Sequence, residues 1–213
     1  MSLLIVTATA PAKPTVLLVP GAPFDSAAAP LAVSMIVLLS AWTETLFRTL
    51  NLPITVLRKV VWWFDVDDPT KFAIGRFPIF ITDSSFGSIY GFPTYGIPGI
   101  KAANHAGGEV TTADSVDRAV HEDEASDVLA FAGAALPSVT PRVLGNAVCL
   151  YSMTPDRDFV VDRHPEHANV IVAAGFSGHG FKFAPVIGDL LTDLALDPLA
   201  KPMPRFAITR FGR

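Results

Sequence analysis

A strand-like run that ends in closely spaced glycines constrains the fold of this chain more than any other feature. Residues 169–174 are almost entirely apolar, and residues 175–180 read Gly-Phe-Ser-Gly-His-Gly. A helical pattern then continues to about Leu196. Glycines at a strand end let another group approach the backbone, and the following helix points its unpaired N–H groups at the same place. The pattern predicts a strand–loop–helix unit that is either a ligand site or a tight packing turn.

The spacing of these glycines excludes two common motifs. The order G-x-x-G-x-G differs from the G-x-G-x-x-G turn that holds a dinucleotide pyrophosphate. The residue two positions after Ser177 is His179, so the loop is also not the G-x-S-x-G turn of a hydrolase nucleophile. Spacing alone therefore leaves the ligand site and the packing turn equally open.

The rest of the chain mixes strand and helix patterns. Two short apolar runs at 3–6 and 16–19 indicate short strands or a poorly defined tail. Further strands are expected at 35–39, 56–64, 77–82, 88–92, 147–151 and 159–162, and helices at 43–50, 111–120 and 122–135. Asp83–Gly87 has the composition of a hairpin turn. The pattern favours an α+β fold with a largely antiparallel sheet.

Composition narrows the class of protein. Half of the 213 residues are apolar, 17% are charged and the net charge is −4, which indicates a globular protein and argues against nucleic acid as a partner. The single cysteine, Cys149, excludes an intramolecular disulfide and a cysteine-rich zinc site. The uncharged run at 26–43 is interrupted by polar residues and proline, whereas a membrane span needs about 20 apolar residues. Because the start of the chain also lacks the basic segment of a secretory signal, we expect a cytoplasmic protein without a membrane partner.

Three separated segments resemble one enzyme family. Residues 169–183 (NVIVAAGFSGHGFKF) closely resemble the C-terminal segment of the monomeric sarcosine oxidase and N-methyltryptophan oxidase family. Residues 90–101 (YGFPTYGIPGIK) are similar to its Tyr-Gly-Phe-Pro…Gly-Leu-Lys segment, and residues 147–156 (AVCLYSMTPD) to its Cys-x-Tyr-x-x-Thr-Pro-Asp segment. Their order and separations agree with the family across about residues 36–211.

The resemblance implies FAD as cofactor and a small amino acid as substrate. Members of the family are flavoenzymes of the wider D-amino-acid oxidase group. The implied reaction is oxidation of a secondary or N-methylated amino acid to an imine, with hydrogen peroxide formed from O2. A truncated, catalytically inactive remnant that keeps only the substrate-domain fold is the alternative.

Cys149 matches the cysteine to which the family attaches FAD, through a thioether to the 8α-methyl carbon of the flavin. The nucleophile in such a bond is the thiolate. Without the resemblance, a lone cysteine on a strand is most simply a small buried residue.

Two residues match catalytic positions of the family. Lys101 matches the lysine near flavin N5 that serves oxygen reduction, where a fixed cation lowers the free energy of superoxide. His105 corresponds to an active-site histidine. Taken alone, Lys101 would be a surface lysine and His105 a packing or surface histidine.

The resemblance also assigns residues to the substrate and to the flavin. Lys182 matches the lysine that pairs with the substrate carboxylate, and we expect its charge to be partly desolvated between Phe181 and Phe183. A snorkelling structural lysine is the alternative. The residues matched to the substrate side of the flavin are Tyr90, Tyr151 and His179, which could otherwise be core residues. The flavin-binding set is Cys149, Gly175, Phe176, Gly178, His179, Gly180 and Lys182, with a helix start near Phe183 whose positive end favours an anionic flavin.

Other notable residues receive structural interpretations. His164 and His167 have H-x-x-H spacing without a third ligand nearby, and Pro165 opposes a helix, so we expect a turn and no metal. Trp62 and Trp63 are most simply core and edge packing.

The N-terminal part departs from the family. The family begins with a G-x-G-x-x-G turn for the FAD pyrophosphate, and this chain has no such motif. We therefore expect a substrate (catalytic) domain plus the C-terminal strand–glycine loop–helix of an FAD-binding domain whose N-terminal Rossmann-like half is missing. A complementing N-terminal half or self-association would supply the missing contacts. The expected parts are an unassigned segment at 1–35, an FAD-domain remnant at 36–53, the substrate-binding domain at 54–145 and a return segment at 146–213.

Overall fold

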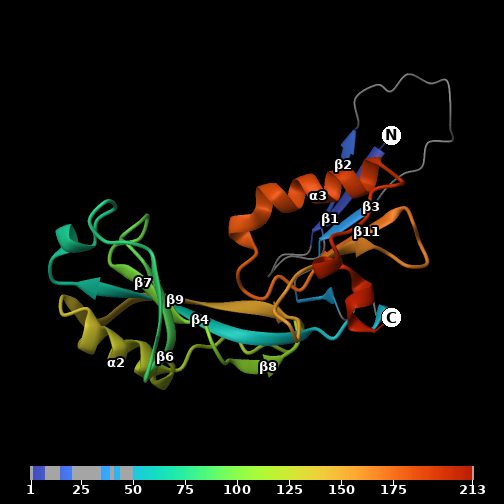
Figure 1. The fold of residues 1–213 in the computed structure, drawn as a ribbon. Helices are drawn as coiled ribbons and strands as arrows, with labels where there is room; N and C mark the ends of the chain where they lie inside the picture. Colours follow the sequence, from blue (N-terminus) through green and yellow to red (C-terminus); the bar gives the residue numbers. More distant parts are fainter. Residues whose placement is uncertain (1, 8–14, 21–34, 39–40, 44–49, 213) are drawn as a thin grey trace. The chain divides into compact units, whose positions relative to one another are not determined.

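The computed structural model describes residues 2–7, 15–20, 35–38, 41–43 and 50–212 (Figure 1). The chain divides into two units, one made of Met1–Val56 with Tyr151–Arg213 and the other of Leu57–Leu150. Most of the helix expected over 43–50 lies outside the described residues. No helix in the described ranges is long and apolar enough to cross a membrane.

The first unit is a mixed five-stranded sheet with one long helix. Its strand order is β10-β11-β3-β1-β2, and β3 pairs in parallel with both β1 and β11 while the outer pairs are antiparallel. The strands are β1 (Ser2–Thr7), β2 (Thr15–Pro20), β3 (Met35–Leu38), β10 (Val160–Arg163) and β11 (Val170–Ala174), and the helix is α3 (Ala184–Leu196). The two short apolar runs near the N-terminus therefore form strands of the same sheet as the glycine-loop strand.

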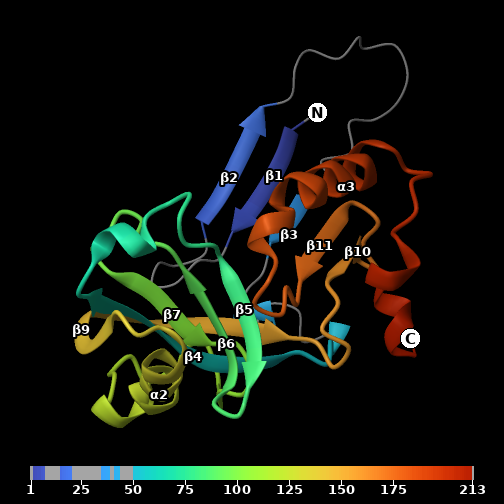
Figure 2. The same cartoon turned by 60° about the vertical axis from the view of Figure 1, so that its left-hand side comes forward.

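Both faces of β11 are buried, which explains its unbroken apolar sequence. Ile171 and Ala173 pack against Leu191 and its neighbours on α3. Val172 and Ala174 face the other way, into a cluster with Leu50, Leu52 and Ile208. The helix lies along the sheet in both views (Figures 1 and 2). The predicted strand–loop–helix unit is confirmed, with a 3-10 turn (Phe181–Phe183) between the loop and α3.

The second unit is built on a six-stranded sheet. Its order is β5-β6-β7-β4-β8, with β9 also pairing with β4, and the pairs of β4 with β7, β5 with β6 and β6 with β7 are antiparallel. The strands are β4 (Thr55–Val66), β5 (Phe80–Ser84), β6 (Gly87–Phe92), β7 (Ile100–Asn104), β8 (Glu109–Thr111) and β9 (Val139–Met153). The helix is α2 (Ser126–Ala135), preceded by a 3-10 turn (Glu122–Ala125). The expected α+β character with an antiparallel sheet is thus observed, whereas the assignment of 54–145 to substrate binding stays a prediction.

Alternation along the strands separates the two faces of this sheet. Phe64, Ile89 and Ile100 are fully buried and pack with Phe131 of α2. Side chains directly opposite one another on antiparallel strands share a face. The pairs Trp63–Lys101, Phe92–Lys101 and Tyr90–Ala103 therefore lie on the face away from α2. We call this face, defined by Trp63, Tyr90, Phe92, Lys101 and Ala103, the lysine face.

The helix predicted over 111–120 is wrong. Residues beyond Thr111, where β8 ends, are not helical until the 3-10 turn at Glu122. Thr112 and Ser115 use their hydroxyls to accept each other's backbone N–H groups, which competes with helical hydrogen bonds. The backbone oxygen of Asp117 accepts a hydrogen bond from the buried guanidinium of Arg58, 2.8 Å away on β4. The segment is therefore held by a strand distant in sequence rather than by its own backbone.

Lys59 makes the stability of the second unit depend on pH. Its buried ammonium donates to the backbone oxygens of Ala106 (2.6 Å) and Gly107 (2.9 Å), and burial lowers its pKa from 10.5 to about 8. Between these two values the unfolded chain binds a proton that the folded chain does not, so this group adds stability as pH rises. We compare the unfolding free energy of the wild type with that of Lys59→Met. The difference, wild type minus variant, should increase by at most roughly 3 kcal/mol from about pH 7 to about pH 10.5. Denaturant unfolding followed by tryptophan fluorescence measures it, and a pH-independent difference between the two proteins would contradict it.

Candidate functional site

Lys101 occupies the middle of the lysine face. It lies on β7 directly opposite Trp63 of β4 and Phe92 of β6. Its Nζ is 5.5 Å from the Trp63 ring centroid and 5.4 Å from the Phe92 ring centroid. These distances are those of cation–π contacts, which hold an ammonium group without neutralising it. The strand pairing therefore places a half-buried cation between two aromatic rings.

Tyr90 and His105 lie against each other, and Tyr90 also contacts Phe92 of the lysine face. Tyr90 precedes Phe92 on the same face of β6, and the two rings are 6.0 Å apart and nearly perpendicular. The His105 ring lies edge-on to Tyr90 at 6.2 Å between centroids. The backbone N–H of His105 donates to the oxygen of Ser88 at 2.6 Å, which ties the residue to β6. Three of the predicted residues, Tyr90, Lys101 and His105, are thus brought together in one unit.

Cys149 also lies in the second unit, on β9. Its side chain is half-buried and its thiol is free of any disulfide. A half-buried thiol is accessible to a reacting group, unlike the fully buried residue that a purely structural role favours. Its assignment as a flavin attachment point stays a prediction.

The glycine loop of the first unit is tightly packed. Gly175 and Gly178 have φ values of +63° and +75°, and a Cβ on Gly178 would lie 2.3 Å from the ring of Tyr151. Ser177 is buried, and its N–H donates to the oxygen of Ser152 at 2.9 Å. Close packing therefore accounts for this glycine, which favours the turn interpretation at that position. The same packing brings the Tyr151 ring against the loop, and its assignment to the substrate side of the flavin stays a prediction.

His179 belongs to an aromatic cluster centred on Phe159. Its ring centroid is 5.0 Å from that of Phe159, and its Nδ1 lies 3.0 Å from the backbone oxygen of Ser177. Phe176 lies 5.1 Å from the same phenylalanine, and a Cβ on Gly180 would meet the Phe176 side chain at 2.7 Å. Packing within the first unit therefore fixes four of the predicted residues, which are Phe176, Gly178, His179 and Gly180.

Lys182 is exposed, so the expected partial desolvation of its charge is wrong. Phe181, which was expected to shield it, is 96% exposed. The ammonium group lies 5.4 Å from the Phe183 ring centroid. The helix α3 then begins without a capping side chain or an acidic residue in its first turn. Lys182 and the positive end of α3 thus form a cationic edge of the first unit.

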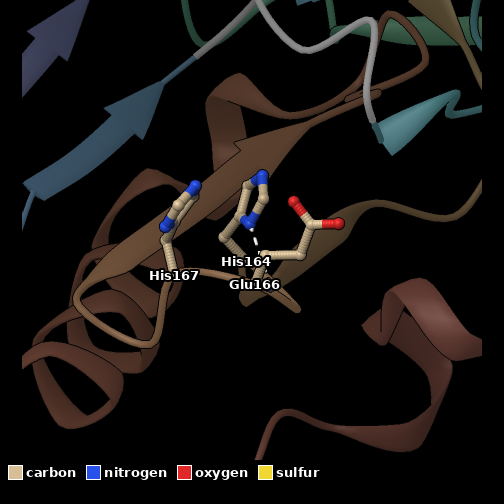
Figure 3. Close-up of side chains that lie close together, drawn as sticks. All are labelled: His164, Glu166 and His167. Atoms are coloured by element: carbon tan, nitrogen blue, oxygen red, sulfur yellow. Dashed lines mark hydrogen bonds between the residues drawn. The ribbon is translucent and has the colours of Figure 1, made fainter.

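His164, Glu166 and His167 form the turn that the sequence predicts (Figure 3). Their potential ligand atoms lie within 4.8 Å of one another, so the expectation that no third ligand lies nearby is wrong: Glu166 is that group. The Nδ1 atom of buried His164 accepts a hydrogen bond from the Glu166 N–H at 3.1 Å, which occupies that lone pair. Burial, and then the neighbouring His167, lower the pKa of His164. These contacts make the ring part of the turn, and the expected absence of a metal stays a prediction.

Sequence reasoning missed Trp63 as a member of the lysine face. The sequence favours a packing role for both Trp62 and Trp63, but consecutive strand residues point to opposite faces. Trp62 is buried against α2, whereas Trp63 contacts Lys101. The alternation of side chains along a strand places the two tryptophans on opposite faces. Only the pairing of β4 with β7 shows which of them contacts Lys101.

Comparison with known proteins gives the relationship directly. The family model described as FAD dependent oxidoreductase matches residues 27–194. Monomeric sarcosine oxidase from a Bacillus species is 38% identical over 169 residues, which cover 78% of this chain and 43% of that protein. N-methyl-L-tryptophan oxidase from Salmonella arizonae is 35% identical over 178 residues, covering 82% and 46%. The chain thus spans less than half the length of these curated relatives.

Solved structures share the fold at low sequence identity. NikD, described as an unusual amino acid oxidase, superimposes with a TM-score of 0.64 at 19% identity over 82% of this chain and 47% of its own. Fructosyl amine oxygen oxidoreductase (Amadoriase I) from Aspergillus fumigatus gives 0.64 at 16% identity over 82% and 42%. The family match covers well over half of the chain, and the fold agrees with it. This chain belongs to the FAD-dependent oxidoreductase family.

Proposed function

We propose that the protein oxidises a secondary or N-methylated amino acid with FAD and passes the electrons to O2. The observation that carries the proposal is the lysine face, where a cation between two aromatic rings adjoins the Tyr90–His105 pair. The names of the relatives, sarcosine oxidase and N-methyl-L-tryptophan oxidase, support this substrate class. The products are an imine, which water hydrolyses, and hydrogen peroxide.

The residues present fit a flavin in two respects. The lysine face offers the half-buried ring of Tyr90 to a planar ring system, and the fixed positive charge of Lys101 to O2 as it becomes anionic. The start of α3, which has neither a capping side chain nor an acidic first turn, offers helix-end N–H groups and Lys182 to a negative group. Cys149, half-buried with a free thiol, would provide the covalent bond.

Different residues of the chain have different roles in the proposed reaction. Bound FAD supplies the acceptor for a hydride equivalent from the α-carbon and the reductant for O2. Lys101 holds a fixed positive charge where O2 becomes anionic, which lowers the free energy of superoxide. Lys182 pairs with the carboxylate of the amino acid as a point charge. The hydroxyl group of Tyr90 and the imidazole group of His105, which lie together in the second unit, orient the amine.

Acid precipitation of the purified protein tests the covalent attachment. We expect the wild-type pellet to remain yellow because a thioether survives acid, and we expect Cys149→Ser to release all of its flavin to the supernatant. Flavin absorbance before acid treatment is the control, since the substitution should leave docked FAD in place. A yellow Cys149→Ser pellet would contradict the assignment of Cys149.

Hydrogen peroxide production tests the proposed reaction itself. Flavin-loaded protein should form one equivalent of peroxide for each sarcosine or N-methyltryptophan oxidised. A glycine or tryptophan substrate without the N-methyl group is the matched control and should react more slowly. A colourless protein that forms no peroxide with any secondary amino acid would favour the inactive remnant instead.

A further inference from the structure

Two adjacent tryptophans of β4 serve different faces of the sheet. Trp62 is 3% exposed and packs with Phe64 in the cluster under α2. Trp63 points the other way and lies half-buried on the lysine face, directly across from Lys101. Core packing accounts for the first tryptophan but not for the second. The contact that the second ring makes on the lysine face is with the Lys101 ammonium group.

In the part of the chain that the structure describes, the Lys101 ammonium group contacts two aromatic rings. Within the described ranges, no hydrogen bond or ion pair reaches its Nζ, and the contacts recorded there are the Trp63 and Phe92 rings. The nearest acid along the same side of β4 is Asp65, two residues beyond Trp63. Its carboxylate is paired with Arg142 at 3.3 Å. Among the residues that the structure describes, no carboxylate is thus paired with the lysine charge to offset its field.

This arrangement suits a charge that must act on a developing anion. A carboxylate partner would fix an ammonium group but would also offset most of its positive potential. Aromatic faces attract the same group through their quadrupoles and leave its net charge unchanged. Two rings on opposite sides also limit the rotamers of a long side chain, which otherwise carries considerable rotamer entropy.

We propose that Trp63 is a positioning residue that, together with Phe92, clamps the Lys101 ammonium group on the lysine face for its action on O2. The action on O2 rests on the proposed function, whereas the clamp itself does not. Trp63 holds the cation in place and does not touch the reacting atoms. The consequence is that loss of the indole should weaken the effect of Lys101 without affecting steps that Lys101 does not serve.

Nuclear magnetic resonance of the protein tests the clamp without any flavin. Protons above an aromatic face are shifted upfield, so the ε-methylene protons of Lys101 should resonate upfield of those of exposed Lys71 in protein labelled with 13C-lysine. The resonance is assigned by its loss in Lys101→Met. We expect Trp63→Leu to move it downfield and Trp63→Phe to keep most of the shift, with circular dichroism confirming that both variants fold. An unmoved Lys101 resonance in folded Trp63→Leu overturns the clamp.

A double-substitution cycle then tests the link to oxygen. In flavin-loaded protein, Trp63→Leu should slow reoxidation by O2 roughly tenfold, as expected for loss of one half-buried cation–π contact, with reduction by substrate unchanged. In the Lys101→Met background the same substitution should have no further effect. Equal slowing in both backgrounds would overturn the proposal. A protein that binds no flavin would refute the proposed function, while the resonance experiment would still decide the clamp.

Discussion

Lys101→Met should slow the reoxidation of reduced flavin by O2 by roughly 100- to 1,000-fold, as expected when one preorganised electrostatic group is removed. Reduction of the flavin by the amino acid should change little, because that step develops no anion beside Lys101. Methionine keeps most of the volume of the lysine stem between Trp63 and Phe92, so the packing of the lysine face is retained. Stopped-flow absorbance of the flavin measures the two half-reactions separately.

Lys71→Met is the matched control for this experiment. Lys71 is an exposed lysine of the same unit whose Nζ donates to the hydroxyl of Ser138 at 3.0 Å, away from the lysine face. Its replacement removes the same charge and should leave both half-reactions unchanged. Equal slowing of reduction and reoxidation by Lys101→Met would contradict the role assigned to Lys101.

Gly99→Ala should destabilise the second unit by roughly 3 kcal/mol or more, through backbone strain together with overpacking. Gly99 has a φ of +83°, and its Cβ would lie 2.0 Å from the backbone oxygen of Phe64. That oxygen belongs to β4 and has no flexible side chain that could yield. The residue immediately precedes β7, so its displacement would also disturb the start of the strand that carries Lys101.

Gly96→Ala measures the cost of backbone strain without the steric clash that Gly99→Ala adds. Gly96 has a similar φ of +72°, but an added Cβ meets nothing within 4 Å. Its cost should be only about 1–2 kcal/mol, the cost of the left-handed conformation for a residue with a Cβ. Chemical unfolding of both variants gives the comparison. Similar losses at the two positions would show that the Gly99–Phe64 approach is not a tight contact.

Local patterns predicted the elements whose partners are near in sequence. The apolar run before Gly175 and the helix after it both appear, because each buries a continuous apolar surface. The β5–β6 hairpin also forms where its turn composition predicts it, although β5 begins at Phe80 rather than at residue 77. The segment at 111–120 fails because the guanidinium of Arg58, on a distant strand, takes a backbone carbonyl there.

The residues of the candidate site likewise include some that the sequence predicted and some that only the structure shows. Family resemblance found Tyr90, Lys101 and His105, and the structure brings the three together on or beside one sheet face. It could not find Trp63, because its part in the site depends on the register between β4 and β7. The flanking phenylalanines gave a wrong expectation for the desolvation of Lys182, since they bury a lysine only if they themselves pack, and Phe181 is 96% exposed.

The central claim is that the lysine face is the surface that meets the flavin. A crystal structure of the FAD-loaded protein tests it most directly. We expect the isoalloxazine ring to lie against Tyr90 and Lys101, with the ammonium group of Lys101 directed at the N5 side and the sulfur of Cys149 bonded to the 8α carbon. A flavin bound elsewhere, for example on the α2 side of the sheet with Lys101 remote from it, would contradict the claim.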